Sequence, residues 1–378
     1  MLLIKNALVY KGECQSPSYE TIGVAEGKFA NPDEMTQPST NVIDAKGKVI
    51  TPGLIDVHTH LGINQQGIGE AGHDFNESSS DSTPEVNSID AITMKDSGFE
   101  DARRAGVTTV QVMPGSANVI GGEMVVIKTA GTIVDDCIVR NPSGLKAAMG
   151  ENPKNHHQKT VQTRMGIAAR LREKLMEAQY YDDHRQKGNC PPNLGLNHIV
   201  KVLHGDIPLR VHAHRADDIA TILRLQKEFQ IDVTIEHATE GHLIIDLLAE
   251  RNVRVAVGPT MSSRPKFELA EQSWETVLAL DNANVPFSLT TDHPVVSIEH
   301  LMTSAILAVK NGLAEVKALQ AITLNAAKHL GIADRVGSIE VGKDADFVVW
   351  NGDPFDLRTT VDGTFINGNC VYQRILDF

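Results

Sequence analysis

Two histidines, His58 and His60, stand one residue apart at the end of an apolar run, in the segment TPGLIDVHTHLG (residues 51–62). In a β-strand, residues i and i+2 point to the same face, so both imidazoles should leave the backbone in one direction. Two imidazoles with a shared direction can bind one divalent cation. The spacing alone also fits two polar residues on the solvent-exposed face of a strand, so residues elsewhere in the chain must distinguish a metal site from such a pair.

Further metal-ligand residues follow other expected strands, at the point where each strand ends. LRVHAH ends in His212 and His214, VTIEH ends in His237, and FSLTTD ends in Asp292. GLKAAMG is followed directly by Glu151. Histidines and carboxylates gathered at strand ends predict a metal centre. The expected ligand set is His58, His60, Glu151, His212, His237 and Asp292.

Six ligands exceed what one tetrahedral ion takes, and they suit two divalent ions about 3.5–4 Å apart with a carboxylate bridging them. We expect His58 and His60 to hold one ion, and His212 and His237 to hold the other. A bound ion lowers the pKa of its water toward ~7, so hydroxide can attack a carbonyl carbon. Asp292 should ligate the first ion, accept the proton of that water as general base, and return it to the leaving nitrogen as general acid. Such ligands suit zinc, iron, manganese or cobalt.

A rhythm of strand and helix from residue 52 to residue 335 must position these residues. One helical stripe is clear between residues 159 and 179, where apolar side chains recur at spacings of three and four. Sustained alternation predicts an α/β fold with a parallel sheet, and about eight strands favour a closed (β/α)8 TIM-like barrel over an open doubly wound sheet. In such a barrel, functional residues lie at the carboxyl ends of the strands. The expected strands end near His60, Met113, Val139, Gly150, Ala213, His237, Val257 and Asp292.

Both ends of the chain consist of short strand-like segments separated by glycines. We expect them to form one small composite β-sandwich, with residues 1–51 as its first part, residues 52–335 as the barrel, and residues 336–378 as its second part. The polar, Gly/Ser-rich stretch 62–88 follows the first barrel strand. Long loops in compact domains are commonly functional, so this one should lie over the mouth of the site.

Composition narrows the class of protein. The chain is 41% hydrophobic and 22% charged, which is typical of a soluble globular protein. A net charge of −13 argues against nonspecific nucleic-acid binding. No apolar run approaches the ~20 residues of a membrane span, and MLLIKNALVYKGE lacks the pattern of a signal peptide. We therefore expect a cytoplasmic protein that acts on a small molecule. The four cysteines are scattered without a C-x-x-C, so no thiolate zinc site is predicted.

Taken together, these motifs resemble the amidohydrolase superfamily. The resemblance rests on PGLIDVHTH, VHAH, EH and TTD at the metal site, and on ITLNAAKHLGI and VGSIEVGKDADFVVW beyond it. It covers nearly the whole chain and is nearest to the imidazolonepropionase-related and Xaa-Pro-dipeptidase-like branch. It implies metal-dependent hydrolysis of a C–N bond in an amide or cyclic amide, in a homo-oligomer. The segments PGSANVIGG, GENPK and GPTMSSR mark a subgroup of uncertain substrate. The ligands that the resemblance implies are His58, His60, His212, His237 and Asp292.

The resemblance also offers a second bridging group. Two-metal relatives often bridge the ions with a carboxylated lysine on the fourth strand, and Lys146 lies on this strand. We favour Glu151 over Lys146, because ligands sit at strand ends. In one-metal relatives the strand-six histidine helps to bind substrate, so His237 has that alternative role.

Substrate contacts are expected from His214, which shares a face with His212, and from Arg264, a cation after the seventh strand that could pair with a carboxylate or phosphate. Lys266 is expected to be a solvated loop charge. A deaminase of a small heterocycle would use the same attack and would release ammonia. A non-catalytic scaffold is disfavoured because the ligand set is complete.

Overall fold

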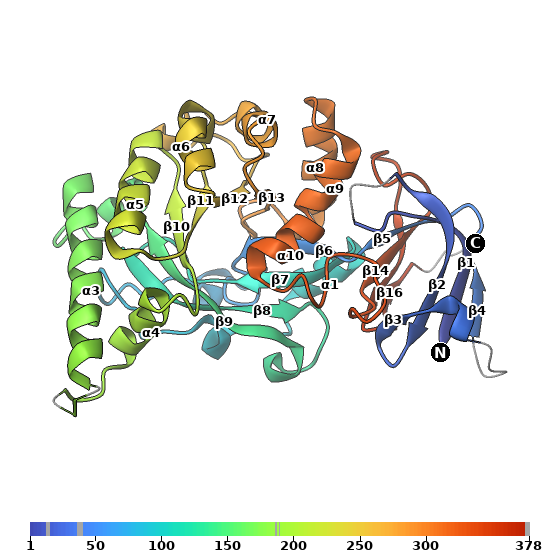
Figure 1. Ribbon diagram of the computed structural model, residues 1–378, viewed down its shortest axis with the longest axis horizontal. Coiled ribbons are helices and arrows are strands. Elements are labelled where there is room, and N and C mark those ends of the chain that lie inside the picture. Colours follow the sequence, from blue (N-terminus) through green and yellow to red (C-terminus); the bar gives the residue numbers. More distant parts are fainter. Residues whose placement is uncertain (13–15, 36–40, 186, 189, 375–378) are drawn as a thin grey trace.

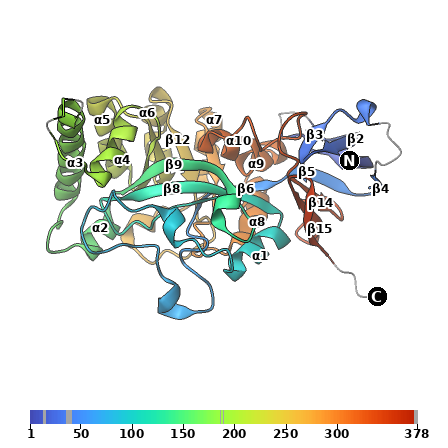
Figure 2. The same ribbon diagram turned by 90° about the horizontal axis from the view of Figure 1, so that it is seen from below.

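The computed structural model describes the chain apart from residues 13–15, 36–40, 186, 189 and 375–378. Its strands form two eight-stranded sheets, one from the middle of the chain and one from both ends. In Figure 1 the long helix α3 (Arg164–Arg185) lies at one extreme of the molecule, and the sheet of end strands lies at the other. Figure 2 shows the same separation from below.

The middle sheet is a mostly closed barrel with the order β6-β7-β8-β9-β10-β11-β12-β13. A parallel bridge between Thr59 and His293 connects its first strand to the segment after its last, and His60 N donates to His293 O at 2.8 Å. The α/β class and the eight-stranded barrel predicted from the sequence are thus confirmed in outline. The strands are β6 (Leu54–Thr59), β7 (Val107–Val112), β8 (Ile120–Lys128), β9 (Ile138–Ala148), β10 (Leu209–Ala213), β11 (Val233–His237), β12 (Arg254–Val257) and β13 (Phe287–Leu289).

Helices cover the barrel along its β9-to-β13 side (Figure 1). In α3 the predicted stripe is buried at Leu171, Leu175 and Ala178, and Ile167 and Tyr181 extend it. The other helices are α1 (Ser97–Arg104), α2 (Glu151–His156), α4 (Leu194–Leu203), α5 (Ala216–Phe229), α6 (Ile245–Glu250), α7 (Glu275–Asn282), α8 (Leu301–Lys310), α9 (Glu315–Ala321) and α10 (Leu324–Leu330).

The barrel departs from regular strand–helix alternation between β7 and β9. Strand β8 runs antiparallel to both of its neighbours, so no helix separates these three strands. The prediction of a separate strand ending near Val139 was therefore wrong. Residues 134–137 form a 3₁₀ turn, and Val139 is the second residue of β9, the strand that also contains GLKAA. The apolar run MVVI instead lies within β8, in the sequence IGGEMVVIK. A fully buried antiparallel meander and a parallel strand share the same apolar pattern, so the sequence did not distinguish them.

The end strands form one hydrogen-bonded sheet in the order β16-β15-β14-β5-β1-β2-β3, with β4 paired to β1. The expected association of the two chain ends is confirmed. Their strands form one continuous hydrogen-bonded sheet, whereas a β-sandwich would have two separate sheets. The domain limits at residues 51/52 and 335/336 stay a prediction. The strands are β1 (Leu2–Val9), β2 (Ser18–Ala25), β3 (Lys28–Ala30), β4 (Asn41–Asp44), β5 (Val49–Pro52), β14 (Phe347–Trp350), β15 (Val361–Ile366) and β16 (Asn369–Gln373).

Charged side chains fill part of the barrel interior, where branched apolar side chains are usual. Asp56, Lys146, Arg210 and Glu236 are all fully buried. Buried charges cost several kcal/mol each unless they are paired and hydrogen-bonded. The interior of this barrel, below the strand ends, therefore contains paired polar and charged side chains in place of some of the usual apolar ones.

The stretch after β6 is ordered by short elements, including 3₁₀ turns at Gly69–Gly72 and Ser88–Ala91 and a bridge between Asn64 and His73. Asn64, Phe75 and Asn76 line the cleft at the strand ends, which agrees with the expected position of this loop over the mouth. Among the described residues, no helix is both long and apolar enough to cross a lipid bilayer.

A buried ion cluster joins the barrel to the sheet of end strands. The Lys128 ammonium, on β8, pairs with Asp346 and lies 3.2 Å from Asp344, and Arg335 reaches Asp344 at 2.8 Å. Lys128 is only 4% exposed. Removal of Lys128 would leave the buried Asp346 carboxylate without its cation, although Arg335 still pairs with Asp344.

We therefore expect Lys128→Met to lower the free energy of unfolding by roughly 3–5 kcal/mol. Urea denaturation followed by far-UV circular dichroism measures this loss. Lys5→Met, at an exposed position of β1, is the matched control and should change stability by less than about 0.5 kcal/mol. Equal stability of the two variants would contradict a linking role for the cluster.

Candidate metal centre

One group of potential ligands forms where β6 and β13 end. Nε2 of His58 and Nε2 of His60 each lie 3.4 Å from Oδ1 of Asp292. His58 and His60 are 1% and 7% exposed, and the Asp292 side chain is 14% exposed. The structure therefore brings together the histidine pair and the aspartate that the sequence placed at the ends of the first and last barrel strands.

Hydrogen bonds fix which nitrogen of each imidazole faces this group. Nδ1 of His58 lies 2.9 Å from Oε2 of Glu236, and Nδ1 of His60 lies 2.8 Å from the Met113 carbonyl oxygen. Both partners can only accept, so each Nδ1–H donates. Burial lowers the pKa of His58 to about 3, with a further contribution from the Lys146 ammonium, so this ring is neutral. Its Nε2 lone pair then faces a carboxylate oxygen, an arrangement that a cation between them makes favourable.

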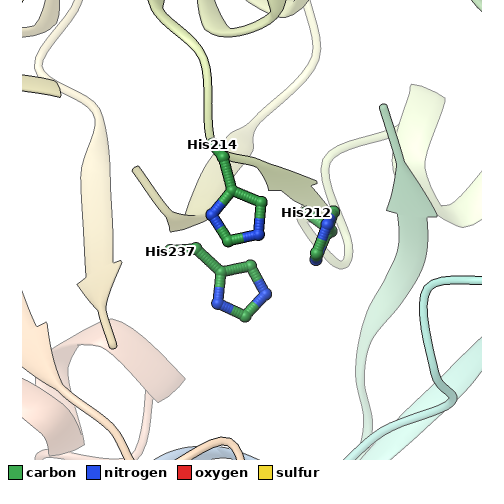
Figure 3. A group of neighbouring side chains, drawn as sticks. All are labelled: His212, His214 and His237. Carbon is green, nitrogen blue, oxygen red and sulfur yellow. The ribbon is translucent and has the colours of Figure 1, made fainter. Parts of the chain in front are cut away.

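A second group contains His212 from β10, His214 directly after β10, and His237 from the end of β11 (Figure 3). Each offers a ring nitrogen within 4.8 Å of the others. Nδ1 of His237 donates to the Gly258 carbonyl at 2.6 Å, and Nδ1 of His214 lies 2.8 Å from the Thr239 hydroxyl. Burial lowers the pKa of all three imidazoles, so they are neutral and able to coordinate.

The two groups adjoin each other, since the rings of His58 and His237 have centroids 4.8 Å apart. Lys146 lies beside them, with its Nζ 3.2 Å from Nε2 of His58. Burial lowers the pKa of Lys146 to about 8, and the carboxylates of Glu236 and Asp292 act in the opposite direction. Three neutral imidazoles on one side and two imidazoles with a carboxylate on the other form a donor set that fits two divalent ions.

Glu151 does not join either group. Strand β9 ends at Ala148, and Gly150, at φ +80°, turns the chain so that Glu151 becomes the first residue of α2. Its backbone N–H donates to Glu268 Oε2 at 3.0 Å, and its side chain is not among those lining the cleft. The preference for Glu151 over Lys146 is thus not supported by their placement: the residue deeper in the strand faces the histidines.

Two buried carboxylates behind the site were missed. Asp56 accepts hydrogen bonds from Thr291 N at 3.1 Å and Thr291 Oγ1 at 2.6 Å, and from the Thr290 hydroxyl, which ties β6 to the strand that leads to Asp292. Burial raises the pKa of Asp56 to about 6, although these hydrogen bonds lower it. Alternation in LIDVHTH could have revealed Asp56, because it precedes His58 by two residues.

Glu236 gave no such signal. It directly precedes His237, so strand alternation would send the two side chains to opposite faces. The backbone of His237 has a φ of +76°, which departs from strand geometry at this point. This turn redirects the side chain of His237, while Glu236, in register with His212, reaches His58 and lies 3.4 Å from Nη1 of Arg210.

A cleft of about 670 Å³ opens over both groups and is lined by His58, His60, His212, His214, His237 and Asp292 among others. Arg264 lies instead in a neighbouring cavity of about 500 Å³, where its guanidinium donates to the Gln272 carbonyl. The two spaces share His237, Pro259, Ser262 and Leu269. Lys266 lines the cleft and is not the solvated loop charge expected from the sequence.

Comparison with known proteins finds relatives along most of the chain. The chain is 27% identical to the imidazolonepropionase of Aeromonas salmonicida (strain A449), over 82% of this chain and 78% of that protein. It is also 27% identical to amidohydrolase tasK of Hapsidospora irregularis over 88% of its own length, but it spans only 37% of that protein.

Among solved structures, an amidohydrolase from Thermotoga maritima MSB8 is 38% identical, with a TM-score of 0.95 and coverage of 99% of this chain and 100% of that one. A Xaa-Pro dipeptidase with bound methionine, 18% identical with a TM-score of 0.62 over 99% and 100% of the two chains, shares the fold. A family model described as the amidohydrolase family matches residues 49–371. Since that match covers most of the sequence, this chain belongs to the amidohydrolase family.

Proposed function

We propose that this protein is a metal-dependent hydrolase that breaks the C–N bond of an amide or a cyclic amide. The observation that carries the proposal is the approach of Asp292 Oδ1 to Nε2 of both His58 and His60, at 3.4 Å each, on the wall of an open cleft. Membership of the amidohydrolase family and similarity to proteins named imidazolonepropionase support the same reaction class.

His58, His60 and Asp292 would hold one divalent ion, and His212 and His237 the other, with His214 within reach of the second. Zinc fits these nitrogen and oxygen donors, as do iron, manganese and cobalt. Bound there, such ions supply a water of lowered pKa and polarise the carbonyl oxygen of a substrate.

The protein's own residues would position the proton transfer. Asp292 follows Thr290 and Thr291, which are both anchored on the buried carboxylate of Asp56, so the Asp292 side chain is held at a fixed place on the cleft wall. Although burial alone would raise the pKa of Asp292, the neighbouring histidines hold it well below its usual range. In our proposal Oδ1 accepts a proton from the attacking water and returns it to the leaving nitrogen.

The reaction class is tested with a panel of N-acyl amino acids, Xaa-Pro dipeptides, cyclic amides and aminated heterocycles, offered to the metal-loaded protein. We expect turnover of an amide or cyclic amide without release of free ammonia from a ring amino group. Ammonia release from the heterocycles alone would assign a deaminase, and absence of turnover across the panel would count against the proposal.

Asp292→Asn keeps the size of the side chain but removes its ability to accept a proton. We expect kcat on the panel substrate to fall at least about 100-fold, while the far-UV circular dichroism spectrum stays unchanged. Asp90→Asn, at an exposed position of a 3₁₀ turn, is the matched control and should retain full activity. Near-normal activity of Asp292→Asn would remove this residue from the role of base.

For the group between the two ions we now favour Lys146, in carboxylated form, over Glu151, because Lys146 Nζ reaches to 3.2 Å from His58 Nε2. Lys146→Met should therefore lower activity at least about 100-fold, whereas Glu151→Gln should change it less than about 3-fold. Turnover of both variants at saturating metal is the measurement. The opposite order of effects would restore the carboxylate of Glu151 as the bridge.

Arg264 is proposed to bind an anionic group of the substrate, with its guanidinium in the cavity next to the cleft. Losing one charge-assisted hydrogen bond costs about 1.5–3 kcal/mol, so Arg264→Ala should raise KM roughly 10-fold or more with little change in kcat. A substrate whose carboxylate is esterified should show no such difference. Arg224→Ala, an exposed arginine of α5, is the control, and equal effects on both substrates would contradict the assignment.

A further inference from the structure

Two segments that supply no proposed metal ligand meet beside the second histidine group. They are residues 150–154, which form the turn after β9 and the start of α2, and residues 258–268, after β12. The first donates the Glu151 N–H to Glu268, and the second places Lys266 Nζ 3.0 Å from Oδ1 of Asn152. The two segments are thus joined by the side chains of Glu268 and Lys266.

The Glu268 carboxylate is almost fully buried, with 1% of the residue exposed. Its Oε2 accepts the Glu151 N–H and packs directly on Gly150, where a Cβ would come within 2.5 Å of it. Its Oε1 lies 3.8 Å from Nε2 of His212 and 3.8 Å from Nε2 of His214. A loop residue is thereby held with one oxygen close to two imidazole nitrogens of the second histidine group.

Oε1 of Glu268 can accept more bonds than its neighbours supply. Within the described part of the chain it forms no hydrogen bond of good geometry, and its short contact is an ion pair with the Lys266 ammonium at 2.6 Å. A buried carboxylate oxygen normally accepts hydrogen bonds or coordinates a metal. The Lys266 ammonium supplies positive charge to this oxygen, as a bound cation would.

From this geometry we infer that Glu268 is a carboxylate ligand of the second divalent ion, supplied by the loop after β12 to the group of His212, His214 and His237. The inference rests on the proposed metal centre and adds a fourth donor to it. Lys266 then has the role of a counter-ion that competes with the metal for Oε1. Its ammonium has a second acceptor in Asn152, and its side chain is 24% exposed, so it can leave Oε1 without losing every partner.

If the ion pair between Glu268 and Lys266 had only a structural role, the effects of mutation would differ from those expected for a metal ligand. If Glu268 and Lys266 only fasten the loop, removal of either one should disturb the histidines in the same direction. If Glu268 binds the ion and Lys266 competes with it, the two removals should change metal affinity in opposite directions, because an ammonium repels a divalent cation. The sign of the Lys266 effect therefore separates the two roles.

The experiment titrates zinc into metal-free protein in competition with a chromophoric chelator, which yields the dissociation constant of each ion. For Glu268→Gln we expect one of the two constants to rise about 10-fold or more and the other to stay unchanged. For Lys266→Met we expect that same constant to fall. Glu271→Gln, the same change at an exposed position three residues away, should leave both constants unaltered.

Wild-type constants in Glu268→Gln would overturn the inference, and so would weaker binding in both variants. If Glu268→Gln is not recovered in folded form by circular dichroism, Lys266→Met decides alone: a lower constant supports the inference, and an unchanged or higher one overturns it. Because the readout is metal affinity, failure here is distinct from failure of the proposed hydrolysis, which would appear as absence of turnover by the metal-loaded wild type.

Discussion

The main physical constraint on this structure is the repulsion between buried hydrogen-bond acceptors, the imidazole nitrogens and carboxylate oxygens of the two groups. In the first group, Nε2 of the neutral His58 ring lies only 3.4 Å from a carboxylate oxygen of Asp292. The second group repeats the problem with three neutral imidazoles. Without positive charge between the donors, such a cluster would be unfavourable, because each buried acceptor has lost its hydrogen bonds to water. Divalent cations bound between these atoms would accept their lone pairs and remove the repulsion. The functional proposal therefore rests on the metal centre.

The barrel interior sustains this arrangement through a chain of polar contacts. Asp56 joins β6 to the strand that carries Asp292, and Glu236 holds His58 in one tautomer while pairing with Arg210. Buried ionised groups of this kind stabilise a fold poorly in comparison with apolar packing. Stability must therefore come from the apolar clusters between barrel and helices and within the sheet of end strands. The two parts of the protein interior thus have different roles. The apolar layers supply stability, and the polar barrel interior fixes the directions of the ligand atoms.

Much of the fold and of the first ligand group was predictable, because both rest on local patterns. Alternating strands and helices indicated a barrel, and the carboxyl ends of β6, β10, β11 and β13 carry the histidines and the aspartate where a barrel would use them. The antiparallel strand β8 was missed, because a buried strand has the same apolar pattern in either direction. Glu151 lies outside both histidine groups because one glycine with positive φ turns the chain at that point. Glu236 directly precedes His237, whose φ of +76° breaks the strand alternation, and Glu268 comes from a distant loop, so neither residue leaves a periodic signal.

The most direct test of the account is an anomalous diffraction map of the wild-type protein, purified without chelator and recorded at the absorption edge of the metal that it contains. The account predicts two peaks, one among His58, His60 and Asp292 and one among His212, His214 and His237. A map with no peak at these groups, or with a single peak, would contradict a centre of two ions.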